Sequence, residues 1–177
     1  MKKCCSLLII MFVVLASAVL AIAADDIKQF PSCKYCGMNR EQFAFSRTYI
    51  DYDDGKPEGF CSIHCAAVDL AVHIDRNPKS ITVGDYKTKE LIDAEKAYWA
   101  IGGSKPGVMT KRAKWAFKTK DDADAFMKEF GGTPGTFDVA MKATYEDMYQ
   151  DTKMIRDRRA AKRKAMEQQK TMEHSHK

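Results

Sequence analysis

The sequence predicts an α+β fold in which two tandem strand–strand–helix units are followed by a long C-terminal helix. In each half of the chain, two segments rich in aromatic and β-branched residues precede a segment with the apolar periodicity of a helix. Residues 138–170 contain neither proline nor glycine, which suits an uninterrupted helix. The first unit is expected over residues 25–80, the second over 81–137, and the C-terminal helix with a basic tail over 138–177.

The first unit is expected to begin with a strand over residues 43–50, where Phe, Thr and Ile are enriched. Residues 53–57, Asp-Asp-Gly-Lys-Pro, predict a chain reversal because Gly and Pro supply the backbone angles of a turn. A short second strand is expected over residues 58–60. A helix follows over residues 62–74, capped by its first serine and ended by the next Asn-Pro pair.

The second unit repeats this order. Residues 91–101 and 114–117 predict its two strands, which a glycine-containing loop connects. Thr119 and Asp122 resemble a capping box in which Asp replaces the usual Glu or Gln. Apolar residues then recur with the i, i+3, i+4, i+7 spacing of an amphipathic helix. Gly131-Gly132 ends this helix, because glycine readily adopts the left-handed conformation of a helix C-terminus.

The C-terminal helix carries an apolar stripe that predicts which of its faces packs on the domain. The stripe alternates steps of four and three residues: Met141, Tyr145, Met148, Thr152 and Ile155. Beyond Arg156 the helix is expected to be exposed. Residues 153–177 hold nine Lys or Arg against three Asp or Glu. We interpret this excess first as a solvated face, and second as a weak contact with anionic lipid or an acidic partner protein.

The first 24 residues have the layout of a secretory signal peptide. Lys2 and Lys3 precede an almost wholly apolar run over residues 4–22, and Ala21-Ile22-Ala23 offers a small-residue cleavage site near residue 23 or 24. A retained membrane anchor is the alternative, since roughly 20 apolar residues can span a bilayer. We expect a periplasmic protein. An exported protein meets little nucleic acid, so the basic tail is not interpreted as a nucleic-acid site.

Four cysteines form two short motifs that could be joined by a bound metal ion or by disulfide bonds. Cys33 and Cys36 have C-x2-C spacing, and Cys61 and Cys65 have C-x3-C spacing. On the predicted frame, the first pair lies in a loop before the first strand. Cys61 ends the second strand, and Cys65 lies in the first turn of the following helix, whose N-terminus should favour its ionised thiolate. Thiolates are the species that bind metals.

The residues alone leave three interpretations open. Met38 lies two residues after Cys36, and a thiolate with a thioether suits Cu(I). The four cysteines also suit a structural tetrahedral Zn(II) site. They could equally form two disulfides in an oxidising compartment. A thioredoxin-like redox role for Cys33 and Cys36 is a weaker fourth interpretation. His64, beside Cys65, is more often a packing residue than a ligand in such a position.

An ordered set of features resembles the NosL family, whose members are exported copper-binding accessory proteins of nitrous oxide reductase maturation in denitrification. The features are Cys36-Gly37-Met38 after an export signal, one strand–strand–helix unit, a second unit with Met109 in its loop, and Ala116-Phe117…Asp122-Ala123…Phe126…Gly131-Gly132. The resemblance covers residues 30–138. It implies Cu(I) binding by Cys36 and Met38, with Met109 as a further ligand.

Some features depart from the family pattern. No cysteine stands at the signal junction, so no lipid anchor is expected, and Pro106 is separated from Met109 by two residues. Cys33, Cys61 and Cys65 exceed the minimal pattern and could add thiolates to the copper site, bind zinc or pair as a disulfide.

The sequence therefore predicts a periplasmic Cu(I) metallochaperone, not an enzyme, because no nucleophile–base pair or carboxylate pair has recognisable spacing. It would deliver Cu(I) by ligand exchange to a copper enzyme, which the resemblance implies is nitrous oxide reductase. No small-molecule substrate is expected. The alternatives are an exported structural-zinc interaction module that uses the four cysteines, and a periplasmic thiol-disulfide oxidoreductase.

Overall fold

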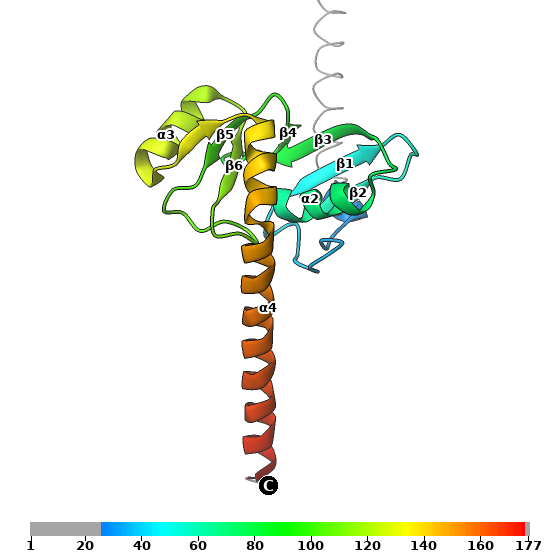
Figure 1. The fold of residues 1–177 in the computed structure, drawn as a ribbon, viewed down its shortest axis with the longest axis vertical. Helices are drawn as coiled ribbons and strands as arrows, with labels where there is room; N and C mark the ends of the chain where they lie inside the picture. Colours follow the sequence, from blue (N-terminus) through cyan, green and yellow to red (C-terminus); the bar gives the residue numbers. More distant parts are fainter. Residues whose placement is uncertain (1–25, 176–177) are drawn as a thin grey trace, which may run out of the picture.

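The computed structural model describes residues 26–175 and confirms the α+β class, with antiparallel strands in two sheets and a long C-terminal helix (Figure 1). Both strand–strand–helix units follow the predicted order. The predicted signal peptide, residues 1–24, lies outside the described residues, as do Cys4 and Cys5. Within the described part of the chain, no helix combines the length and the hydropathy needed to cross a membrane.

The first sheet has the strand order β2-β1-β3-β4 and contains both predicted strands of the first unit. Its elements, with the helix that follows β2, are β1 (Thr48–Tyr52), β2 (Glu58–Phe60), α2 (Ile63–Val72), β3 (Pro78–Gly84) and β4 (Leu91–Asp93). β1 and β2 form the predicted hairpin, with Thr48 opposite Phe60 and Ile50 opposite Glu58. The hairpin therefore returns the end of β2 to the start of β1, which decides where the cysteines meet.

Two predicted strands have the wrong extent. The strand expected over residues 43–50 begins only at Thr48, because the preceding residues form hydrogen-bonded turns. The strand expected over residues 91–101 is in fact two strands that belong to different sheets. A turn separates them, in which the Asp93 carboxylate accepts a 3.0 Å hydrogen bond from the backbone N–H of Glu95. A short side chain that bonds its own backbone favours a turn over a continued strand.

Sequence reasoning missed β3 and β7 (Thr133–Gly135). Both contain a proline, which local rules associate with helix ends and turns. β3 nevertheless pairs along the length of β1, and β7 pairs with β5. The boundary between units expected at residue 80 stays a prediction, and β3 runs across that position.

The second sheet has the order β6-β5-β7. Its remaining strands and the helix that follows them are β5 (Tyr98–Ile101), β6 (Lys114–Phe117) and α3 (Lys120–Phe130). The N-cap half of the predicted capping box is confirmed: Thr119 Oγ1 accepts from the backbone N–H of Asp122 at 3.2 Å. The Asp122 carboxylate accepts from the Thr119 hydroxyl at 2.8 Å, whereas a full capping box uses the backbone N–H of the capping residue. Gly131 follows α3 with the predicted positive φ of 74°. A hydrogen bond from the Tyr86 N–H to the Ala116 carbonyl (2.9 Å) links the connection between β3 and β4 to the second sheet.

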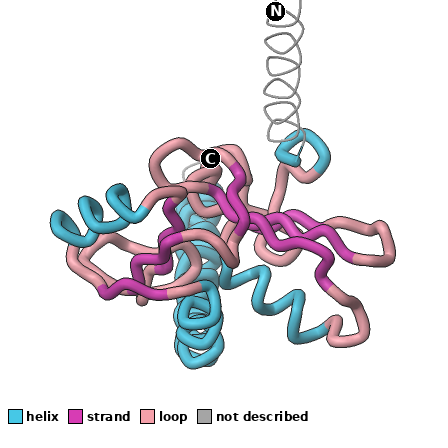
Figure 2. Tube along the Cα trace, turned by 90° about the horizontal axis from the view of Figure 1, so that it is seen from above, coloured by secondary structure: helices cyan, strands magenta, loops and turns pink. Residues whose placement is uncertain are grey.

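The long helix α4 (Phe137–Ser175) contacts α2, β5 and β7 with its N-terminal part, and the rest extends away from the domain (Figure 1). Figure 2 shows α4 nearly end-on where the two groups of strands meet. From Arg156 to Met172 almost every residue is exposed, as predicted.

The buried stripe of α4 has the predicted spacing but lies one residue earlier than expected. It follows Ala140, Thr144 and Asp151, with the half-buried Asp147 between the last two, whereas the predicted member Tyr145 is 44% exposed. The polar members were overlooked because their partners are distant in sequence. Asp147 accepts from Lys114 Nζ at 2.7 Å, and Asp151 accepts from the Lys111 N–H at 3.1 Å. Pairing of this kind offsets the cost of burying a carboxylate.

Candidate metal centre

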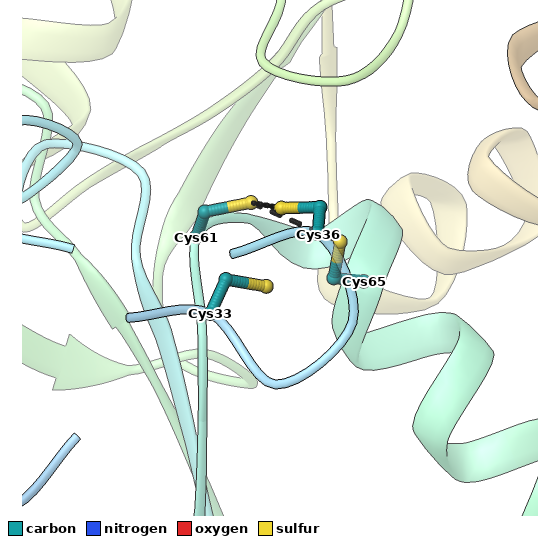
Figure 3. A group of neighbouring side chains, drawn as sticks. All are labelled: Cys33, Cys36, Cys61 and Cys65. Carbon is teal, nitrogen blue, oxygen red and sulfur yellow. Dashed lines mark hydrogen bonds between the residues drawn. The ribbon is translucent and has the colours of Figure 1, made fainter. Parts of the chain in front are cut away.

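The two cysteine motifs converge on one cluster (Figure 3). The Sγ atoms of Cys33, Cys36, Cys61 and Cys65 all lie within 4.8 Å of one another. Cys36 Sγ is 3.4 Å from Cys61 Sγ, which is 3.8 Å from Cys65 Sγ. Three of the sulfurs belong to buried residues of the hydrophobic core, and Cys36 is half-buried. We call these four residues the thiol cluster.

The spacing of the thiol cluster fits metal coordination. The four cysteines are free, and 3.4 Å is far longer than the roughly 2.05 Å of a disulfide bond. Four thiolates at about 2.3 Å from one tetrahedral ion would lie about 3.8 Å apart. The separations of 3.4 Å between Cys36 and Cys61 and 3.8 Å between Cys61 and Cys65 are close to that value. Three of these sulfurs could also surround a Cu(I) ion, which accepts soft ligands at lower coordination number.

The thiols share their protons unequally. Hydrogen bonds from Cys36, Cys61 and Cys65 lower the pKa of Cys33, more than burial raises it. Hydrogen bonds to Cys33 and Cys36, together with burial, raise the pKa of Cys61 and of Cys65. The expectation that the helix N-terminus would make Cys65 ionise readily is therefore wrong for the four-thiol cluster. A bound cation would reverse this, because it removes the repulsion between neighbouring thiolates.

The loop that carries Cys33 and Cys36 is shaped by backbone hydrogen bonds. The Gly37 N–H donates to the Cys33 carbonyl and the Cys33 N–H to the Met38 carbonyl, both at 2.9 Å. Gly37 has a φ of 73°, which other residues adopt only with strain. The backbone of Cys36 also hydrogen-bonds the Cys33 sulfur, and the backbone of Met38 that of Cys36. These bonds favour the ionised sulfurs that a metal requires.

Asp69, which the sequence analysis missed, fixes this loop to α2. Its buried carboxylate accepts from Tyr35 Oη at 2.7 Å and from Tyr52 Oη, and Lys34 Nζ lies 3.1 Å away. Burial would raise the pKa of Asp69, but the bonds from both tyrosines and Lys34 outweigh it and hold that pKa below its usual value. Tyr35 stands between the two cysteines of the loop, so this bond places both of them.

Arg40 fixes the other side of the cluster. Its guanidinium is fully buried, donates from Nε to the Phe60 carbonyl at 3.1 Å, and pairs with Asp26 at 2.8 Å. Phe60 directly precedes Cys61, so the arginine holds the end of β2 at the cluster. A buried pair of this kind is costly to break, because one charge is then left without a partner.

Met38, from the first unit, and Met109, from the second, line the same pocket beside the thiol cluster. Both are half-buried and pack against the core that contains the buried cysteines. Together with Cys36 they line a pocket of about 980 Å³. Met109 has a φ of 63°, and Ser62 Oγ donates to the neighbouring Val108 carbonyl at 3.3 Å, which ties the Met109 loop to the start of α2. We call this hollow the methionine pocket.

His64 lies outside the thiol cluster. It is buried against α4, with Nδ1 at 3.7 Å from the Asp151 carboxylate, and burial lowers its pKa. This position agrees with its interpretation as a packing residue.

Comparison with known proteins places the chain. The NosL family model matches residues 24–145, more than half of the chain. The chain belongs to the NosL family. The crystal structure of the copper chaperone NosL from Shewanella denitrificans is similar at 25% sequence identity with a TM-score of 0.48, over 60% of this chain and 87% of that one. No curated protein matches.

The NosL match contains the thiol cluster, Met38, Met109 and the packed start of α4. It confirms the family recognised over residues 30–138. It ends before Met154, Ile155, Arg158 and Arg159, which line the methionine pocket from α4.

Proposed function

We propose that this NosL protein is an exported metallochaperone that carries Cu(I) on thiolates of the cluster and exchanges it through Met38 and Met109. One observation carries the proposal: Cys36 belongs to the thiol cluster and also lines the methionine pocket. It is the half-buried member of the cluster, so an ion could pass between buried thiolates and accessible thioethers without leaving soft ligands.

The arrangement suits transfer by ligand exchange. Cys33, Cys61 and Cys65 are buried and would retain the ion, whereas the half-buried side chains of Cys36, Met38 and Met109 are reachable by an incoming ligand. A partner's cysteine or methionine could bind Cu(I) before Cys36 or Met38 releases it. No step needs a general base or a nucleophile. Family membership and the predicted export signal support periplasmic delivery to a copper enzyme, for which we propose nitrous oxide reductase.

A resident Zn(II) ion is the second candidate, because four sulfurs within 4.8 Å of one another suit a four-thiolate Zn(II) site equally well. Met38 separates the two candidates. A thioether is a soft ligand that contributes to Cu(I) sites but little to Zn(II) sites.

The test is an anaerobic competition of Cu(I) and Zn(II) between chromophoric chelators and reduced protein comprising residues 25–177. We expect Met38→Leu to weaken Cu(I) about tenfold and leave Zn(II) unchanged, and Cys36→Ser to weaken Cu(I) by about 100-fold or more. Met166→Leu, which changes a half-exposed methionine of α4, is the matched control and should change neither affinity. Equal affinities for Met38→Leu and wild type would refute copper exchange through the pocket.

A further inference from the structure

The methionine pocket has an aromatic wall. Phe45, Tyr86 and Trp115 line it and contact one another, with ring centroids 5.2 to 6.0 Å apart. Phe43 extends this wall, since its ring lies 6.0 Å from that of Phe45. Aromatic side chains provide large apolar contact areas with little conformational freedom to lose. The wall therefore suits an apolar side chain of a binding partner.

The rim of the same pocket is basic. Cations from three separate segments line it: Lys87, Lys89, Lys105, Arg158 and Arg159. No Asp or Glu is among the described residues that line the pocket. The segments are the turn after β3, the loop between β5 and β6, and α4. Their convergence depends on the fold and does not follow from the basic tail alone.

Most of these cations lack a carboxylate partner. Lys87 pairs with Asp122, and Lys105 Nζ lies 4.5 Å from the ring centroid of Phe130. Among residues 26–175, Lys89, Arg158 and Arg159 form no ion pair. Like charges that share one hollow repel each other, and an anionic occupant would relieve that repulsion.

We propose that the methionine pocket is a docking site for an acidic segment of the copper-exchange partner, in which a methionine is flanked by carboxylates. The methionine side chain is apolar enough for the aromatic wall and soft enough to take Cu(I) beside Cys36 and Met38. The carboxylates would pair with the basic rim. The proposal rests on the proposed copper function for the role of that methionine, but the docking itself does not require copper.

A bilayer is the other anionic surface that an exported basic protein meets. Anionic lipid would attract exposed cations anywhere on α4, including Lys162 and Arg163, which lie one helical turn beyond the pocket pair. An acidic segment in the pocket would depend on Arg158 and Arg159 and not on the next turn. The convergence of three segments on one hollow with an aromatic wall favours the segment.

The test is the fluorescence anisotropy of a dye-labelled synthetic peptide, one methionine between aspartates, added to reduced copper-free protein. We expect binding that weakens about tenfold in Arg158→Glu/Arg159→Glu, since two charge pairs become repulsive. Lys162→Glu/Arg163→Glu makes the same charge change outside the pocket and should weaken binding less than about twofold. A peptide with asparagines in place of aspartates should bind the wild type more weakly.

Loss of affinity by the same factor in both double variants, or no binding of the peptide to wild type, would overturn the docking site. The docking site would also be overturned if Arg158→Glu/Arg159→Glu lost binding to phosphatidylglycerol vesicles but kept its binding to the peptide. Lipid would then be the occupant of the pocket.

A separate Cu(I) titration of the wild-type protein without peptide tests the copper function alone. A norleucine peptide should bind copper-free protein but fail to remove Cu(I). Removal of Cu(I) by that peptide would contradict the role given to the methionine.

Discussion

Tyr35 and Tyr52 offer a paired test of how the cysteine loop is held. Each donates its hydroxyl to the buried carboxylate of Asp69, so Tyr→Phe at either position removes one hydrogen bond to the same acceptor group. Tyr35 lies between Cys33 and Cys36, whereas Tyr52 lies on β1. If the bond to Asp69 pre-organises the loop, only the first substitution should weaken metal binding.

The structure predicts that the substitution with the larger effect on stability, Tyr52→Phe, has the smaller effect on Cu(I) affinity. A hydrogen bond to a charged group contributes about 1.5–3 kcal/mol when buried. Tyr52 is 1% exposed, so we expect Tyr52→Phe to lower the free energy of unfolding by about 2 kcal/mol. Tyr35 is 37% exposed, so water screens its bond and Tyr35→Phe should cost about 1 kcal/mol. That amount, transferred to metal binding, raises the Cu(I) dissociation constant about fivefold.

Two measurements on each variant complete the test: urea unfolding of the reduced protein, and anaerobic Cu(I) competition. Tyr52→Phe should be the less stable variant yet keep its Cu(I) affinity within about twofold of wild type. Of the two variants, Tyr35→Phe should lose less stability but bind Cu(I) more weakly. Cu(I) affinities that fall in proportion to the loss of stability in both variants would refute pre-organisation through Asp69.

Two further pairs test the same structure elsewhere. Gly37 and Gly55 both have a φ of 73° and open space around the missing Cβ, so Gly→Ala should cost about 1 kcal/mol of stability at either position. Only Gly37→Ala should weaken metal binding, and equal Cu(I) affinities in the two variants would contradict the role given to the loop. Burial would raise the pKa of Asp147, but hydrogen bonds from Arg112 and Lys114 outweigh it and hold that pKa below 3.8. The stability it contributes is therefore present above about pH 4 and lost as pH falls through the lowered pKa. Asp147→Asn should remove about 2 kcal/mol at pH 7 and flatten the acid limb of stability against pH. Asp157→Asn, in an exposed pair on α4, should do neither in the same urea-unfolding series.

Local sequence was enough to predict elements whose determinants lie within a few residues. The β1–β2 hairpin depends on its Gly-Pro turn, and α3 on its Thr119 cap and terminal glycines. β3 and β7 could not be predicted in this way, because each carries a proline and owes its strand conformation to a partner strand elsewhere in the chain. The α4 stripe was misplaced by one residue for a related reason: the partners of Asp147 and Asp151 lie on and before β6.

The sequence by itself determined the family of this protein and which residues are candidate metal ligands: two short cysteine motifs, a methionine two residues after Cys36, and an ordered pattern that identified the NosL family. Tertiary structure decided that the motifs form one thiol cluster, that Asp69 and Arg40 hold it, and that Cys36 opens into a basic pocket with Met38 and Met109. The physical reason is the sequence distance over which each interaction acts. Residue type and short spacing set which atoms can bind a metal, whereas strand pairing and helix packing set which atoms meet.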